Sequence, residues 1–307
     1  MELHEFIRKY GTEDACREAF RKARERHGVV CRNCQGKEHY WLSTVEQFKC
    51  KSCGTRTTLR SGTALQASKL PFTYWFTAMF MMVFTKHSIS ALALQNLLGH
   101  KRYEPIWLMM HKIRMVMGNQ DRPIPLKGEL ELDDAFFEVG DPRPDDQELK
   151  RGKGSQRQAQ LLVMAESSPI KGPVKKHKKS RACGRFKMQV ITEANSNSIN
   201  YEVRRHVDHQ SKIISDKYAG NMKLKEVVRK HQAHTVPKEE AGKILPWVHI
   251  AIANSKRVFL DAYHRINSDY LQNYLDEFCY RLNRRYMKRS ELLESLMIAM
   301  TSGVWFM

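Results

Sequence analysis

The sequence lacks the two features that mark secreted and membrane proteins. Its first residues, MELHEFIRKYG, contain no basic stretch followed by an apolar one. The most apolar run, residues 70–84, is fifteen residues long, and a transmembrane helix needs about 20. Pro71 opens this run, as proline often opens a helix. We therefore expect a buried helix in a soluble, cytoplasmic protein that has no membrane partner.

Acidic residues are scarce as well. The 307 residues include 33 Asp and Glu against 52 Lys and Arg, which gives a formal net charge of +19. An excess of this size attracts polyanions, because phosphate contacts release condensed counterions. The charge favours a nucleic acid partner over a purely solubilising role. By itself it does not distinguish DNA from RNA or from anionic lipid.

The sequence has no sign of a disulfide framework: its seven cysteines are odd in number, and their Cys-x-x-Cys spacing suits reduced thiols and a metal. Four of them form two Cys-x-x-Cys pairs, Cys31 with Cys34 and Cys50 with Cys53. Four thiolates at this spacing satisfy tetrahedral Zn²⁺ and leave no open coordination position. The sequence therefore predicts a structural zinc site, without a catalytic role, in a ribbon of short strands.

The length of the chain predicts more than one domain. Near the start, Thr12 is placed to cap a helix that ends at Gly28. From residue 68 to 118 the apolar spacing becomes helical, with segments at 72–84, from Ser88 or Ser90 to Gly99, and beyond residue 103. This arrangement fits a helix-turn-helix reader of DNA, and equally an ordinary helical hairpin with a methionine-rich core.

A linker is expected at residues 119–127, followed by three strands, a helix, a fourth strand and more helices. The strands are predicted at 130–139, 160–165, 185–192 and 212–215, and the helices at 199–207, from Pro246 and from Asn267. This order is that of a ribonuclease-H-like core, so the predicted fold class is multidomain α+β. The predicted divisions are an N-terminal helix (1–28), a zinc ribbon (29–62), a helical, helix-turn-helix-like DNA-binding segment (63–122), a ribonuclease-H-like α/β domain (126–290) and a C-terminal tail (291–307).

Two aspartates stand out in the strands of this core. Asp133 lies in the middle of a half-buried strand, where a charge is costly unless it is paired or binds a metal. Asp216 directly follows the apolar strand KIIS. Carboxylates at neighbouring strands can hold Mg²⁺ ions for phosphoryl transfer. On spacing alone, a surface aspartate and a capping aspartate explain the two residues at least as well.

Longer motifs carry a family resemblance. In chain order they are EDAC, CRNC, CKSC, SGTAL, LPFTYWF, ELDDAFFEVG, IISDKYAG, LPWVHIAIANSKR, AYH and YLQNYLDEFCYRLNRR. On these residues, over most of its length, the chain resembles bacterial transposases of the insertion-sequence 1595 family, which carry an ISXO-type DDE domain. The resemblance implies a metal-dependent transposase of the bacterial cytoplasm, associated with the nucleoid, with a ribonuclease-H-like core.

The resemblance also implies a set of catalytic residues. The subgroup uses Asp, Asp, Asn and Lys, which correspond to Asp133, Asp216, Asn254 and Lys256. The first three would bind Mg²⁺ or Mn²⁺, and an amide oxygen such as that of Asn254 is a suitable though weak ligand for a hard cation. Lys256 would hold a phosphate as a point charge.

Other positions near these motifs are assigned less specific roles. His249 and His264 flank the Asn254 helix, but metal-activated water requires no histidine, so packing or phosphate contact is the expected role of both. Asp261 stands where relatives have Gly, and we interpret it as a solvated charge. Residues 138–140 replace the usual Gly-Gly strand end. The candidate DNA-binding cations are Lys175, Lys176, Lys178, Lys179, Arg181 and Arg257.

The function predicted from the sequence is DNA transposition. The ribbon and the helical segment would recognise terminal inverted repeats in double-stranded DNA, and a homo-oligomer would bring two ends to the target. One rival, a non-catalytic, DNA-binding relic of a transposase, explains the charge and the cysteines equally well. A second rival is a metal-dependent nuclease on the same fold, which would cut DNA without joining ends. A ribosomal or transcription zinc-ribbon protein explains residues 29–62 and leaves most of the later chain unused.

Overall fold

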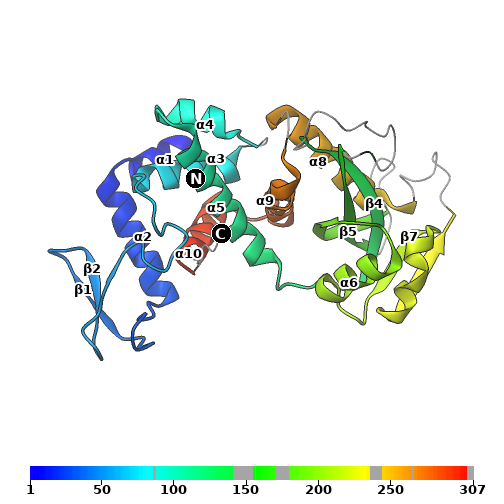
Figure 1. Cartoon of the computed structure of the whole chain (residues 1–307), viewed down its shortest axis with the longest axis horizontal. Coiled ribbons are helices and arrows are strands. Elements are labelled where there is room, and N and C mark those ends of the chain that lie inside the picture. Colours follow the sequence, from blue (N-terminus) through cyan, green and yellow to red (C-terminus); the bar gives the residue numbers. More distant parts are fainter. Residues whose placement is uncertain are drawn as a thin grey trace, which may run out of the picture. The chain divides into compact units, whose positions relative to one another are not determined.

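The computed structural model describes residues 1–85, 88–140, 155, 157–170, 180–235, 244–263 and 266–302. The chain divides into two compact units (Figure 1). The first, here called the ribbon unit, comprises residues 1–117 and 286–307, and the second, the sheet unit, comprises residues 118–285. The boundary at residue 117 falls within helix α5 (Tyr103–Asp121).

The ribbon unit begins with two helices, α1 (Leu3–Tyr10) and α2 (Glu13–His27). The Thr12 hydroxyl accepts a hydrogen bond from the Ala15 amide at 3.3 Å, and Gly28 ends α2 with φ of +96°. A short antiparallel sheet follows, in the order β1 (His39–Leu42), β2 (Gln47–Cys50), β3 (Arg56–Thr58). The predicted N-terminal helix and the ribbon of short strands are therefore present.

Helix α3 (Phe72–Phe84) matches the predicted apolar helix, and nine of its thirteen residues are buried. Its aromatic side chains form part of the core, with Phe80 stacked between Phe6 and Phe84 at centroid distances of 4.2 and 4.1 Å. The run is apolar because it is enclosed by other helices of its unit. None of the helices in the described ranges has both the length and the apolar character needed to cross a membrane.

The end of the chain completes the ribbon unit. The segment predicted as a tail is mostly helix α10 (Arg289–Ser302), which packs on α2 and α3. An ion pair joins Arg26 to Glu294 at 2.6 Å, and the Ala64 amide donates to the Met300 carbonyl at 3.0 Å. Between α3 and α5 lies α4 (Ala91–Leu98), with Ser90 as its cap and Gly99 in the left-handed region, as the sequence predicts.

The sheet unit is built on five strands in the order β6-β5-β4-β7-β8. Strands β4 (Glu129–Glu138), β5 (Gln158–Pro169) and β6 (Arg181–Ile191) are antiparallel neighbours. Strands β7 (Lys212–Asp216) and β8 (Lys230–His234) run parallel to β4. The unit is thus mixed α/β, with β4 at the centre of a mixed sheet.

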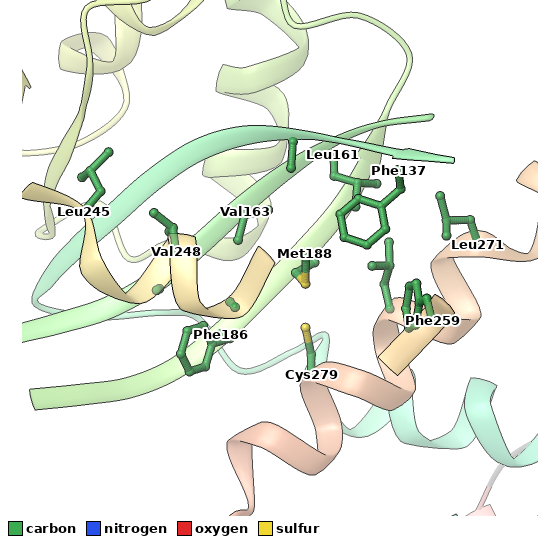
Figure 2. Packing of buried hydrophobic residues seen from close by; sticks show 14 of the residues in the cluster. Phe137, Leu161, Val163, Phe186, Met188, Leu245, Val248, Phe259, Leu271 and Cys279 are labelled. Atoms are coloured by element: carbon green, nitrogen blue, oxygen red, sulfur yellow. The ribbon is translucent and has the colours of Figure 1, made fainter. Parts of the chain in front are cut away.

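Helices cover both faces of this sheet. One apolar cluster packs α6 (Ser196–His206) and the 3₁₀ helix η1 (Ala219–Glu226) against side chains such as Leu132. The other cluster packs α8 (Pro246–Ala262) and α9 (Leu271–Asn283) against the opposite face, where Figure 2 shows Val163, Phe137 and Met188 beneath the helices. A short 3₁₀ turn, η2 (Ser268–Tyr270), leads into α9.

Two parts of the sheet unit differ from the prediction. Helix α5 extends to Asp121, so the predicted linker at 119–127 begins inside a helix. Asp121 is held there because its carboxylate accepts hydrogen bonds from Arg284, Arg185 and Asn283 at 2.7, 3.0 and 2.8 Å. Strand β8 was not predicted, because its sequence, KHQAH, is polar. The segment forms a strand by pairing with β7 at the edge of the sheet.

Candidate functional site

The four cysteines of the two Cys-x-x-Cys pairs converge on one point of the ribbon. Their sulfur atoms all lie within 4.8 Å of one another. The Sγ atoms of Cys31 and Cys53 are 3.5 Å apart, as are those of Cys34 and Cys50. Tetrahedral Zn²⁺ with Zn–S bonds of about 2.3 Å requires sulfur separations of about 3.8 Å. The four thiols therefore fit a structural zinc ion, as predicted.

Both cysteine turns have the same backbone design. In the first, the Gln35 amide donates to the Cys31 carbonyl at 3.0 Å, and in the second the Gly54 amide donates to the Cys50 carbonyl at 3.0 Å. The residue after the second cysteine lies in the left-handed region in each turn, with φ of +59° at Gln35 and +73° at Gly54. Glycine adopts this conformation without strain, whereas glutamine does not.

In the sheet unit, the strand register brings the two predicted aspartates together. Leu132 of β4 pairs with Ser215 of the parallel strand β7, so Asp133 and Asp216 are the next residues on neighbouring strands. Both lie on the face covered by α8, because their neighbours on the same side, such as Ala135 and Ile214, pack in that cluster. Two carboxylates thus share one face of the sheet, the pair that the family resemblance implies.

Local contacts orient both carboxylates. The Asp133 side chain is 15% exposed, and its Oδ1 accepts a hydrogen bond from the Asp134 amide at 2.9 Å. Asp216 Oδ1 accepts from the Nδ2 amide of Asn221 at 2.7 Å and from the Tyr218 backbone at 3.3 Å. Sequence reasoning missed Asn221, which is 2% exposed; its place five residues after Asp216 carried no recognisable signal.

Helix α8 brings His249 to the first of the two carboxylates, that of Asp133. The Nε2 atom of His249 lies 3.7 Å from Asp133 Oδ2. Burial lowers the pKa of His249, so its imidazole is neutral near pH 7 and a ring nitrogen is available as a ligand. The sequence analysis gave His249 only a packing or phosphate-contacting role. A usable signal existed, because His249 is seven residues, or about two helical turns, before Lys256.

The remaining predicted residues of α8 are divided between its two flanks. Lys256 shares the flank of His249, and its Nζ lies 5.5 Å from the ring centroid of Phe137 on β4. Asn254 is five residues after His249, about 140° around the helix, and therefore lies on the other flank. Asp261 is exposed and lies seven residues after Asn254, so it is on the same flank of α8 as Asn254. The structure therefore brings Asp133, Asp216, His249 and Lys256 to one side, and Asn254 to another.

The carboxylate site is less closed than the ribbon site. Within the residues that the structure describes, the cysteine quartet alone brings three or more potential ligands within 4.8 Å. The carboxylates and His249 belong to three elements and do not converge on one point to this extent. Further along the chain from β4, the Gly140 amide of the unusual strand end at 138–140 donates to the Ile266 carbonyl at 2.7 Å.

The predicted DNA-binding cations have different environments. Arg181 is occupied inside the sheet unit: its guanidinium donates to Glu129 and to the side chain of Ser167, each at 2.6 Å. Arg257 is exposed on α8. His264 and the other candidates, Lys175, Lys176, Lys178 and Lys179, lie outside the described residues. Of these six candidates, Arg181 and Arg257 lie within the described residues, and Arg257 is the exposed one of the two.

Two protein-family models match the chain. The transposase zinc-ribbon domain matches residues 11–56, and the ISXO2-like transposase domain matches residues 125–283. No curated protein matches the sequence. The two matches define the class of protein as a transposase with an N-terminal zinc ribbon. Because the transposase domain alone covers more than half of the sequence, the chain belongs to the insertion-sequence 1595 (IS1595) family, and the predicted resemblance is confirmed.

Proposed function

We propose that the protein is a metal-dependent DNA transposase whose reacting centre is formed by Asp133, Asp216 and His249. Membership in a transposase family supports the reaction class. The observation that carries the assignment of residues is the 3.7 Å contact between Asp133 Oδ2 and His249 Nε2, with Asp216 next to Asp133 in the strand register. His249 takes the place that the sequence prediction gave to Asn254.

We also propose that the sheet unit is a ribonuclease-H-like domain. Its strands support this, because the first three are antiparallel and the next two run parallel to the first, in the order β6-β5-β4-β7-β8. The predicted divisions at 29–62, 63–122 and 126–290 are retained as ribbon, helical DNA-binding segment and catalytic domain. We expect the first two to recognise terminal repeats, and a homo-oligomer to bring two DNA ends together.

The donor set suits a divalent cation. Carboxylate oxygens are preferred by Mg²⁺ and Mn²⁺, and a neutral imidazole favours the softer Mn²⁺ of the two. Such a cation, when bound, lowers the pKa of water and neutralises charge that develops on the phosphate. Asp133 and Asp216 would hold it from neighbouring strands and His249 from α8. Lys256, held against Phe137, would place its positive charge beside a phosphate of the flanking DNA.

The proposed reaction has two in-line displacements at phosphorus. In the first, water attacks the phosphodiester at the end of the element, and the bond from phosphorus to the 3′-oxygen breaks, leaving a 3′-hydroxyl on the element. In the second, this hydroxyl attacks a target phosphodiester, and the 3′-oxygen of the target leaves. Each step replaces one P–O bond by another, so no covalent bond to the protein is needed.

The test is cleavage and joining of labelled DNA that carries the repeat flanking the gene, with Mg²⁺ or Mn²⁺. The wild-type protein should nick the DNA and join the ends, and Asp133→Asn should do neither while still binding the DNA. Nicking without joining would favour the nuclease. Binding without cleavage by either protein would indicate a DNA-binding relic, and the proposed chemistry would be rejected.

A further inference from the structure

One buried carboxylate of the sheet unit has no part in the proposed reaction. Glu131 is fully buried on β4, two residues before Asp133, and therefore on the same face of the sheet. A buried carboxylate is costly unless hydrogen-bond donors satisfy it. Its Oε2 accepts hydrogen bonds from backbone amides of helix α8, more than a hundred residues later in the chain, and the Ser167 side chain on β5 is a further partner. Glu131 thus connects the strand of the first aspartate to the helix of His249.

The start of α8 depends on this contact. Leu245, at the cap position, contributes no side-chain hydrogen bond, and Pro246 has no amide hydrogen to donate. The next two amides, of Trp247 and Val248, both donate to Glu131 Oε2, at 2.7 and 3.1 Å. A carboxylate at this position satisfies amides that have no partner within the helix, and it complements the positive end of the helix dipole.

The contact and the reacting centre are adjacent in both elements. On β4, Glu131 and Asp133 are separated by two residues, about 7 Å. On α8, Val248 donates to Glu131, and the next residue, His249, lies 3.7 Å from Asp133. Figure 2 shows Val248 and Leu245 packed against the sheet at the same end of α8, so apolar contacts hold the helix down while Glu131 fixes its end.

We propose that Glu131 is a positioning residue that fixes the N-terminus of α8 on β4 and thereby holds His249 opposite Asp133 for metal binding. This inference rests on the proposed function, because it assumes that these two residues share a cation. Its consequence is that loss of Glu131 weakens metal binding even though Glu131 contacts neither the metal nor the DNA. Substitution of a residue that orients a metal ligand typically lowers metal affinity 10- to 100-fold.

The ribbon unit offers a matched control. Glu13 of α2 accepts hydrogen bonds from the Phe72 and Thr73 amides at 2.9 and 3.0 Å, at the start of α3. Helix α3 also lacks a side-chain cap of its own, since Pro71 occupies that position. Glu13→Gln therefore weakens the same kind of contact in the ribbon unit, because glutamine keeps only one of the two acceptor oxygens. Asp121→Asn supplies a second control, because it removes a largely buried carboxylate charge from the sheet unit without altering Glu131.

The experiment measures Mn²⁺ binding to the full-length protein by the loss of the free-ion paramagnetic resonance signal, below the unfolding temperature of each variant. We expect Glu131→Gln to weaken Mn²⁺ binding at least tenfold and Glu131→Ala to weaken it further, because glutamine keeps one acceptor oxygen. Glu13→Gln and Asp121→Asn should bind Mn²⁺ within about twofold of wild type.

Wild-type affinity in Glu131→Gln and Glu131→Ala would overturn the positioning role and leave the proposed metal site intact. An equal loss in Asp121→Asn would overturn it too, since general destabilisation would then explain the effect. If wild type binds no more Mn²⁺ than Asp133→Asn, the proposed metal site itself is absent, and the positioning role is rejected with it.

Discussion

The two candidate metal centres of this transposase are assembled in opposite ways. The ribbon site takes all its ligands from one segment of 23 residues, from Cys31 to Cys53, and its sulfurs already lie at metal-binding separations. The sheet site takes its groups from β4, β7 and α8, so it exists only when distant elements pack together. A local site depends on turn geometry, whereas a dispersed site depends on the stability of a whole unit.

Removal of zinc should have the largest effect, and it is the strongest test of whether the ribbon unit and the sheet unit are stabilised independently. Structural zinc binds to zinc-finger peptides with an apparent free energy of about 10–16 kcal/mol, and in such small modules this binding drives folding. In the chelated full-length protein, or in Cys50→Ser, we expect amides of β1 and β2 to lose protection from hydrogen exchange. Amides of β4 and β5 in the sheet unit should keep theirs. Loss of protection in both units would show that the two sites are not independent.

A substitution within the sheet unit should have the next largest effect. Asp121→Asn removes the charge that pairs with Arg284 and Arg185, and the Asp121 side chain is only 10% exposed. Because breaking a buried ion pair costs about 3–5 kcal/mol, and these arginines are partly exposed, we expect a loss of about 3 kcal/mol. Hydrogen exchange of β4 amides in rising urea measures this loss. For comparison, Glu25→Gln removes an exposed ion pair with Arg21 in the ribbon unit, and it should change the stability of that unit by less than about 0.5 kcal/mol.

The two flanks of α8 provide a sharper comparison within the sheet site. His249→Ala should lower the rate of DNA nicking about 100-fold, equivalent to about 2.7 kcal/mol, because it removes a group beside Asp133. Asn254→Ala, on the other flank, should lower it by less than about threefold. Single-turnover nicking at saturating Mn²⁺ measures both. The reverse ranking would restore Asn254 as the third ligand and remove His249 from the site.

The smallest expected effect distinguishes the two cysteine turns. A side chain added at Gly54 has room, since the nearest atom of Lys49 is 3.8 Å from the added carbon. Its cost is therefore conformational, about 1 kcal/mol for a residue in the left-handed region. We expect Gly54→Ala to weaken zinc affinity about fivefold. Gln35→Gly, the opposite change in the other turn, should leave affinity equal or higher. Competition with a chelating dye measures both.

The parts that the sequence predicts well are those with local signals. Thr12 and Gly28 delimit α2, and Ser90 and Gly99 delimit α4, because caps and left-handed residues act within one helical turn. Strand β8 and helix α10 escaped prediction as elements. The residues of β8 are polar, and α10 gains its stability by packing on helices from the start of the chain.

The sheet site shows the same limit. The family motif located Asp133 and Asp216, and the pairing of β4 with β7 brings them together. The choice of the proposed third ligand depends on which flank of α8 faces β4, and this is decided by tertiary packing of Val248, Ala251 and Phe259 rather than by any local pattern. Spacing could have grouped His249 with Lys256, but it could not have shown that this flank meets Asp133.

The position of α10 has a consequence for how the protein is made. Ribosomes synthesise the chain from its N-terminus, so residues 118–285 emerge before α10 does. The sheet unit can therefore fold while synthesis continues, whereas the ribbon unit has no partner for the faces of α2 and α3 that α10 covers. Residues 1–117 supply most of the ribbon unit, yet this unit is completed only after the sheet unit has been synthesised. A stop codon after residue 285 and before residue 289 would thus leave the sheet unit whole and the ribbon unit without α10.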